Sequence, residues 1–362
     1  MRILVVNAGS SSLKLSALDG DDELVGSENL EAPGGRPDEA ALDRAIARWA
    51  PIDAVGHRIV HGGTAFAGPV LVTPPIRDQL EALTGLAPIH QPNSLRALDV
   101  VSAHLDRVPA VACFDTAFHA TLPPAASTYA VPSEWREKWG VRRFGFHGLS
   151  HAYIARRAAE MLGGSARLVS CHLGAGASLA AIDHGRSVDT TMGFTPLEGL
   201  VMATRSGTVD PGLVLWLEEH EHVPTSEVND ILEHRSGLLG LAGSADMRDV
   251  TAAEAGGNAD ASLAIGVYLH RLRASIASMV AAMNGLDALV FTGGVGEHAG
   301  DIRQRTGDGL GFLGMAIDPE ANRSAVPDTE ITAQGATVRT LVITAREDLE
   351  ITRGVRSVLE GD

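Results

Sequence analysis

Basic side chains are scarce in this chain of 362 residues, which carries 29 lysines and arginines against 45 aspartates and glutamates. The formal net charge of −16 argues against nucleic acid as a partner, because proteins bind the phosphate backbone through basic surface. It also disfavours binding to an anionic membrane surface. Any anionic substrate must therefore be held by a few locally placed cations, so an arginine near a glycine-rich loop is a first candidate for a binding site.

Cysteine is nearly absent as well, since Cys113 and Cys171 are the only two in the chain. Two cysteines, each within an apolar run, are too few for a disulfide framework and predict buried thiols in a reducing, cytoplasmic setting. No secretory leader is expected, because only four apolar residues separate Arg2 from Asn7. The longest apolar helical stretch, residues 262–283, contains one histidine and two arginines, which excludes an ordinary membrane span.

Glycine, in contrast, is abundant at 40 copies, and several glycines follow predicted strands. Residues 3–6 form an apolar run that leads into the small residues 7–12, and alternating apolar positions then continue towards Asp19. This pattern predicts a β-hairpin. A similar strand, glycine turn and strand occupy residues 167–183, about half a chain further on, which suggests duplicated domains.

Helices and strands alternate in the rest of the chain. Helical spacing and apolar runs predict helices over residues 37–49, 150–162 and 263–283, and strands over 110–114 and 288–291. Ser150 is expected as the N-cap of its helix and Gly163 as its stop. The last strand is expected to open into a glycine turn at residues 293–297. Strands that feed glycine turns and alternate with helices indicate the α/β class.

The turn of the first hairpin is suited to binding phosphate. Small residues leave backbone amides accessible, and the hydroxyls of Ser10 and Ser12 would add donors. The spacing of a Walker A loop is absent. Taken alone, the segment is more often a plain turn.

Two charged residues lie on or after predicted strands in the first third of the chain. Arg58 is able to form a bidentate pair with a carboxylate, either of a substrate or in a structural salt bridge. Asp115 follows an apolar strand, where α/β folds usually place catalytic groups, and its carboxylate suits Mg²⁺ or the orientation of a nucleophile. Neither residue is diagnostic alone.

Two more polar residues complete the candidate set. His147 stands at the entrance of a predicted helix and is able to donate a hydrogen bond to a phosphoryl oxygen. Arg205, in a loop, suits the stabilisation of a transferring phosphoryl group, although ordinary surface arginines are commoner. Together with the hairpins, and with no thiol or serine triad, this set favours phosphoryl transfer.

Eight motifs, in order along nearly the whole chain, resemble those of the acetate kinase family: VVNAGSSSLK, GHRIVHGG, FDTAFH, RRFGFHGLSH, TPLEGLVMATRSG, SGLLGLAGSADMRD, FTGGVGEH and TAREDLEITR. The resemblance implies a homodimer with the duplicated two-domain, ribonuclease H-like ASKHA fold of actin, Hsp70 and sugar kinases. ATP would bind in a cleft between the domains. The N-terminal domain would comprise residues 1–117 closed by 349–362, and the C-terminal domain, 118–348, would carry most of the nucleotide site.

The resemblance also implies roles for the matching positions. The catalytic residues would be Asp115, His147 and Arg205, with Arg58 and Arg205 on the acyl carboxylate and the migrating phosphoryl group. Mg²⁺ (or Mn²⁺) would lie near Asn7, Asp115 and Glu347. The acyl group would fit a small apolar pocket of Val60, Ile89, Phe146 and Pro196. ATP or ADP would contact Ser10, Ser12, Lys14, His172, Gly174, Gly176, Asp246, Met247, Arg248, Gly294, Val295 and Gly296.

Some positions depart from the family pattern. Ala175 stands where the family commonly has asparagine, so one polar contact near the phosphates is expected to be missing. The other departures are Gln91, Leu149, Ala203 and Arg346. None of them removes a residue to which the resemblance assigns catalysis.

The implied activity is that of an acetate kinase, which transfers the γ-phosphoryl group of ATP reversibly and in line to acetate, giving acetyl phosphate and ADP. The acid is ionised at pH 7, so no strong general base is required. A propionate or butyrate kinase stays open, because one methylene in an apolar pocket is worth only about 1–3 kcal/mol. A sugar kinase would need a hydroxyl-reading pocket, and a nucleotide-gated binding protein would not need an acyl pocket at all.

Overall fold

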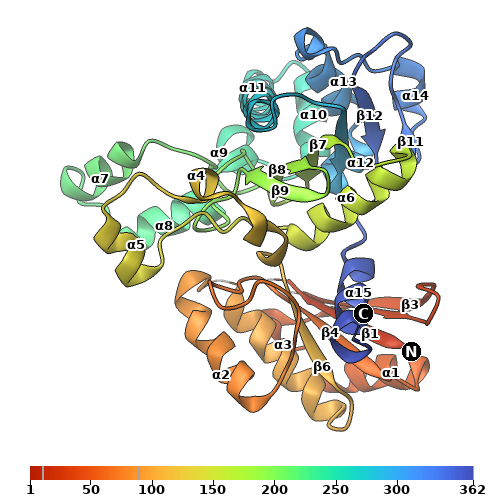
Figure 1. The fold of residues 1–362 in the computed structure, drawn as a ribbon. Helices are drawn as coiled ribbons and strands as arrows, with labels where there is room; N and C mark the ends of the chain where they lie inside the picture. The colour runs from red at the N-terminus through yellow and green to blue at the C-terminus, as the bar shows by residue number, and fades with distance from the viewer. Residues whose placement is uncertain (10–11, 89, 362) are drawn as a thin grey trace. The chain divides into compact units, whose positions relative to one another are not determined.

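The computed structural model describes residues 1–9, 12–88 and 90–361. Its contacts divide the chain into two compact units. The first unit comprises residues 1–120, 146–153 and 346–362, and the second comprises 121–145 and 154–345. Each unit is built around one six-stranded sheet with helices packed against it (Figure 1).

The first sheet has the order β3-β2-β1-β4-β6-β5. Its strands are β1 (Ile3–Ala8), β2 (Ser12–Leu18), β3 (Leu24–Glu31), β4 (Ala54–Ile59), β5 (Val70–Leu71) and β6 (Ala110–Phe114). The predicted hairpin is present, since β1 pairs antiparallel with β2, and β3 extends it as a third antiparallel strand. Strands β1, β4 and β6 are parallel. Their carboxyl ends therefore meet at one edge of the sheet, where α/β folds bind ligands.

Helices cover both faces of this sheet because successive strand residues point to opposite sides. Leu4 and Val6 of β1 belong to a core that also includes residues of α1 (Glu39–Trp49) and α3 (Gln91–His104). Ile3 and Val5 pack on the other face, in a core with Ile351 of α15 (Glu347–Leu359). The shorter helical segments before residue 122 are η1 (Pro33–Gly35), α2 (Pro74–Ala82), η2 (Leu83–Leu86) and η3 (Ala117–Thr121).

The second sheet has the order β11-β12-β10-β7-β8-β9. Its strands are β7 (Arg167–Leu173), β8 (Ala177–Asp183), β9 (Arg186–Thr190), β10 (Ala288–Thr292), β11 (Thr329–Glu330) and β12 (Arg339–Val342). Strands β7, β8 and β9 form an antiparallel meander, β7, β10 and β12 are parallel, and β11 is an antiparallel edge strand. Read in reverse, this order repeats the first sheet strand for strand. The duplication predicted from the two hairpins is therefore present.

The longest helix, α11 (Ala259–Ala282), packs against β8 and β9 of the second sheet. The other helices are α4 (Pro124–Ser127), α5 (Ser133–Trp139), α6 (Gly148–Leu162), α7 (Pro211–Glu219), α8 (Thr225–His234), α9 (Gly237–Ala242), α10 (Met247–Ala255), α12 (Gly293–His298), α13 (Gly300–Asp308), η4 (Gly311–Leu313) and α14 (Pro319–Arg323). In the described part of the chain, none of the helices has the combined length and apolar character needed to cross a membrane.

Two local predictions are wrong. Ser150 does not cap its helix, because α6 already begins at Gly148, whose N–H is bonded to the carbonyl of Asp115 at 2.8 Å. The expected glycine turn after β10 is the helix α12, where the side chain of Glu297 accepts the N–H of Gly293 at 3.0 Å and so satisfies an end group of the helix. The predicted helix stop at Gly163 is confirmed, with φ at 76°.

Candidate active site

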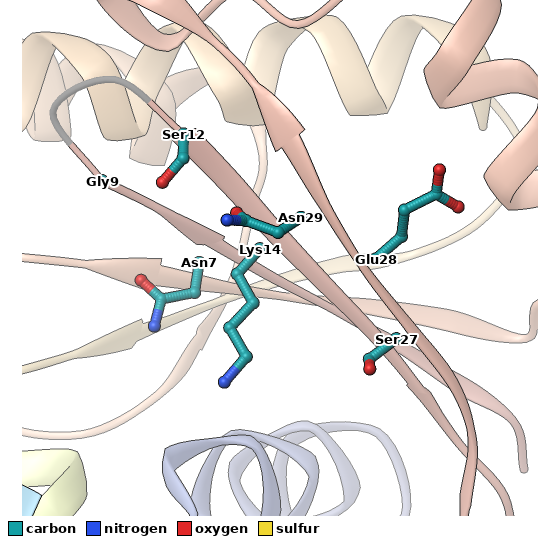
Figure 2. Close-up of a pocket in the computed structure, with 7 residues that line it drawn as sticks. All are labelled: Asn7, Gly9, Ser12, Lys14, Ser27, Glu28 and Asn29. Atoms are coloured by element: carbon teal, nitrogen blue, oxygen red, sulfur yellow. The ribbon is translucent and has the colours of Figure 1, made fainter. Parts of the chain in front are cut away.

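The first hairpin borders a pocket of about 430 Å³. The residues that line it are Asn7, Gly9, Ser12, Lys14, Ser27, Glu28 and Asn29. Asn7, Lys14 and Asn29 occupy paired positions on β1, β2 and β3. Figure 2 shows the side chains of Asn7 and Lys14 on the same side of the strands, whereas the carboxylate of Glu28 points away from them. This pocket therefore joins two predicted phosphate-binding residues, Ser12 and Lys14, to the predicted metal ligand Asn7; Ser10 lies outside the described residues.

Four predicted residues form one hydrogen-bonded network at the carboxyl edge of the first sheet. Arg58 lies near the end of β4, and Asp115 directly follows β6. The Nε of Arg58 donates to Asp115 Oδ1 at 2.9 Å. Arg58 Nη1 donates to the Oδ1 of Asn7 at 3.1 Å. The Nδ2 of Asn7 donates to Oε2 of Glu347, the first residue of α15, at 3.1 Å. The ends of β1, β4 and β6 and the start of α15 therefore assemble side chains that are up to 340 positions apart in the sequence.

The ion pair between Arg58 and Asp115 is largely hidden from solvent, with 19% and 1% of the two side chains exposed. Burial raises the pKa of Asp115, Arg58 opposes that rise, and the negative charge of Glu347 adds to it. Burial alone would lower the pKa of Arg58, yet Asp115 and Glu347 together raise it above its ordinary value. Arg58 therefore stays protonated. Of the two alternatives that the sequence left open for Arg58, the structural salt bridge is present.

This ion pair does not use all the donors of Arg58. A guanidinium has five N–H groups. The hydrogen bonds to Asp115 and Asn7 engage Nε, Nη2 and one N–H of Nη1. Counting only partners in the described part of the chain, Arg58 therefore has N–H groups left to donate to an anion.

His147 and Asp115 are brought close together through their backbones. His147 precedes α6 and has a positive φ of 55°, which is uncommon for a residue other than glycine. The next residue, Gly148, donates its N–H to the carbonyl of Asp115 at 2.8 Å, and a Cβ at position 148 would overlap that oxygen. Only glycine allows this approach without movement. The bond from Gly148 thus fixes the backbone next to His147 against Asp115.

The residues predicted for an acyl pocket are apolar and buried where they are described. In the first unit, Val60 is 7% exposed and Phe146 is 1% exposed. The ring of Phe146 packs edge-on against His61, with centroids 5.4 Å apart, and its carbonyl is held by Nε2 of His119 at 3.0 Å. Pro196 is buried in the second unit. Ile89 lies outside the described residues.

Arg205 lies in the loop between β9 and α7, as predicted. Its Nε is 3.0 Å from Oε2 of Glu233, and its Nη1 is 3.5 Å from the carbonyl of Pro196. The loop is joined to the second hairpin, because the N–H of Ala203 donates to the carbonyl of Ala175 at 3.0 Å. Ala175 thus contributes its backbone here, although it lacks the polar side chain common in the family.

The remaining predicted nucleotide residues lie in three local structures of the second unit. His172 is the second-to-last residue of β7. In the hairpin turn that follows, the N–H of Gly174 donates to the carbonyl of Gly176 at 3.0 Å. Asp246 caps α10 by accepting the N–H of Arg248 at 2.8 Å. Hydrogen bonds from the Arg248 side chain lower the pKa of Asp246 to about 2. The other predicted positions are Met247, the first residue of α10, and Gly294, Val295 and Gly296 within α12.

Three residues that line the hairpin pocket were missed in the sequence: Ser27, Glu28 and Asn29 of β3. Most of β3 is exposed, so its apolar and polar residues do not alternate clearly. The signal that identifies them is the pairing of strands. Once β3 is placed beside β2, Asn29 falls opposite Lys14 and Ser27 opposite Ser16.

Comparisons with known proteins agree with the geometry. The model of the Acetokinase family matches residues 39–353. The acetate kinase of Nostoc punctiforme is 47% identical over 321 residues, which cover 88% of this chain and 79% of that protein. The crystal structure of Porphyromonas gingivalis acetate kinase superposes with a TM-score of 0.91 at 34% identity and covers 99% of both chains.

A propionate kinase is similarly close in structure. The crystal structure of the enzyme from Francisella tularensis subsp. tularensis SCHU S4 has a TM-score of 0.92 at 34% identity, with 99% of this chain and 100% of that one covered. The resemblance noted in the eight motifs and the predicted fold class are both confirmed. The chain belongs to the acetokinase family, whose members are phosphotransferases that act on a carboxyl group.

Proposed function

We propose that this enzyme is an acetate kinase that transfers the γ-phosphoryl group of ATP reversibly to acetate, giving acetyl phosphate and ADP. The observation that carries the proposal is the network of Asn7, Arg58, Asp115 and Glu347. It lies at the carboxyl ends of the parallel strands β1, β4 and β6, and Asn7 also lines the hairpin pocket. Phosphoryl transfer needs positioned charge more than covalent chemistry, and this network supplies it.

In the proposed reaction, the acetate carboxylate attacks the γ-phosphorus in line. The acid is ionised at neutral pH, so the protein need not remove a proton. Arg58 keeps N–H groups to hold an anion while Asp115 fixes its guanidinium. We propose that Arg205 stabilises the negative charge of the migrating phosphoryl group. His147 would donate a hydrogen bond to one of the phosphoryl oxygens.

The donor set fits a hard divalent cation, either Mg²⁺ or Mn²⁺. Mg²⁺ is usually held by one or two carboxylates together with substrate phosphates, and it keeps several waters. Asp115 and Glu347 supply two carboxylates, and Asn7 supplies an amide oxygen. Burial, and to a smaller extent the charge of Glu347, raises the pKa of Asp115, so a bound cation would offset both effects. No group of three or more His, Cys, Asp or Glu side chains among the described residues forms a metal cage by itself. Once bound with ATP, the cation would neutralise charge on the phosphates.

The buried apolar residues Val60, Phe146 and Pro196 support a small acyl group as the other substrate feature. Propionate is the second candidate, because a propionate kinase superposes on this chain as well as an acetate kinase does. One added methylene changes binding by only about 1–3 kcal/mol, so the two acids differ by degree.

We further propose a homodimer that works in the cytoplasm within acetyl-CoA metabolism. The dimer and the pathway are supported by the family resemblance. A reducing compartment is supported by Cys113 and Cys171, which are both buried free thiols. Light scattering of the purified protein tests the dimer, and a mass near 37.8 kDa for the particle would contradict it.

Removal of single arginines tests the proposed roles. We expect Arg205→Ala and Arg58→Ala each to lower kcat by on the order of 10³-fold. Each substitution removes a positive charge that would face the acetate carboxylate or the migrating phosphoryl group. The assay traps acetyl phosphate with hydroxylamine. Arg77→Ala is the matched control, since Arg77 also pairs with two acids in the first unit but lies outside the network. Near-normal turnover in both variants would refute the assignment.

A further inference from the structure

The loop that carries Arg205 is bonded at several points to the last turn of α8 (Thr225–His234) and to the segment that follows it. Ser206 N–H donates to the carbonyl of Leu232 at 3.0 Å, and the carbonyl of Thr204 accepts the N–H of Ser236 at 2.9 Å. Met202 is tied in the same way, since its carbonyl accepts the N–H of Leu238 at 2.9 Å. The backbone of Arg205 is therefore held in one place within the second unit.

Gly237 explains why the two segments approach so closely. It has a positive φ of 61°, and a Cβ there would overlap the carbonyl oxygen of Met202. Backbone hydrogen bonds alone do not orient the long side chain of Arg205, however, because an arginine has several rotatable bonds and high rotamer entropy. A separate contact is needed to orient the guanidinium.

Glu233 makes that contact. It lies in the last turn of α8 and is 9% exposed. Its Oε2 is 3.0 Å from Nε of Arg205, and its own carbonyl accepts the hydroxyl of Thr204 at 2.9 Å. Because a buried carboxylate is costly without a charged partner, the pair is expected to persist. The same residue thus contacts the Thr204 side chain of the loop through its carbonyl and the end of the Arg205 side chain through its carboxylate.

We propose that Glu233 is a positioning residue for phosphoryl transfer, which orients the guanidinium of Arg205 through its Nε. This rests on the proposed function, in which Arg205 meets the migrating phosphoryl group. With Nε bound to Glu233 and Nη1 beside the carbonyl of Pro196, the plane of the guanidinium is set before any substrate binds. A preset donor loses less freedom in the transition state, so the effect falls on kcat.

Three substitutions separate orientation from charge. Glu233→Gln keeps an oxygen that accepts the Nε proton but removes the negative charge. Glu233→Asp keeps the charge but withdraws it by one methylene, and Glu233→Ala removes both. If orientation is the role, Glu233→Gln retains most of kcat, whereas Glu233→Asp and Glu233→Ala lose about 10- to 100-fold. KM for acetate and for ATP should change much less than kcat.

The matched control is Glu254→Ala. Glu254 of α10 pairs with Arg305 at 2.7 Å, and 21% of its side chain is exposed, so this variant also breaks a partly buried ion pair in the second unit. It should lose thermal stability while keeping kcat. A purely structural role for Glu233 would give the same pattern in Glu233→Ala, and that result would overturn the inference.

Combining Glu233→Ala with Arg205→Ala completes the test. If Glu233 acts through Arg205, the double variant is no slower than Arg205→Ala alone, because there is no guanidinium left to orient. An equal loss of kcat in both backgrounds would refute that.

Should Arg205→Ala itself turn over normally, the proposed role of Arg205 fails. If Arg205→Ala is slow while Glu233→Asp and Glu233→Ala keep full kcat, only the inference about Glu233 fails. Should Glu233→Ala not fold, the contrast between Glu233→Gln and Glu233→Asp decides, and equal full activity in both contradicts the proposal.

Discussion

Replacing Gly148 by alanine should separate the backbones of Asp115 and His147. In the native chain, the N–H of Gly148 donates to the carbonyl of Asp115 at 2.8 Å. An added Cβ would overlap that same oxygen and would also lie 3.1 Å from Cβ of Phe118. Since the oxygen belongs to the backbone, neither neighbour is able to rotate away, and the start of α6 has to shift.

The expected magnitudes follow from this overlap. Extra atoms in a packed site usually cost about 1–3 kcal/mol. Loss of the hydrogen bond adds about 0.5–1.5 kcal/mol. Alanine regains up to about 1 kcal/mol of helix propensity. We therefore expect a net destabilisation of about 0.5–4.5 kcal/mol. A displacement of His147 by about 1 Å should lower kcat by about 10²-fold.

Thermal unfolding and hydroxylamine trapping of the acyl phosphate measure the two effects of Gly148→Ala. Gly266→Ala is the control, because position 266 lies within α11 and has open space around its Cβ. That variant should keep kcat and be slightly more stable. Wild-type kcat and melting temperature in Gly148→Ala would refute the account of how Asp115 and His147 are held together.

Three further predictions concern the phosphate pocket, the buried histidines and the thiols. Lys14→Ala should raise KM for ATP by about tenfold with little change in KM for acetate, because it removes an exposed cation from the pocket; equal changes in both constants would contradict this. Burial lowers the pKa of His57, His61 and His119 to about 3, 4 and 4, so below pH 6.5 the unfolded chain binds protons that the folded chain does not. The melting temperature should therefore be lower at pH 5 than at pH 7, and an equal or higher value at pH 5 would count against it. Burial raises the pKa of both cysteine thiols, so a thiol reagent should react with the folded enzyme only slowly, and rapid labelling without denaturant would be inconsistent with their burial.

Much of the fold was predictable because its central elements are apolar and regular. The strand at 110–114 is β6 with the same limits, and both hairpins are where apolar alternation placed them. Strand β3 was missed because most of its residues are exposed, so its pattern carries little information about a buried face. The start of α6 was misplaced because Gly148 is fixed by a tertiary bond to Asp115, which no local signal reveals.

The site was less accessible to sequence reasoning than the fold. Strand ends predicted that Arg58 and Asp115 were candidates, but their pairing depends on the parallel neighbours β4 and β6. Glu347 reaches Asn7 from the opposite end of the chain, so only the family resemblance suggested it. Glu233 carried no motif at all. Its relevance appears only when α8 is placed beside the loop of Arg205.

The most direct test of the account is the coupling of ATP turnover to carboxylic acids of two to four carbons. Hydroxylamine-trapped acyl phosphate and released ADP are measured together for acetate, propionate and butyrate. We expect equal amounts of the two products, with the highest kcat/KM for acetate. ADP release that is indifferent to every added acid, with no acyl phosphate formed, would contradict the account.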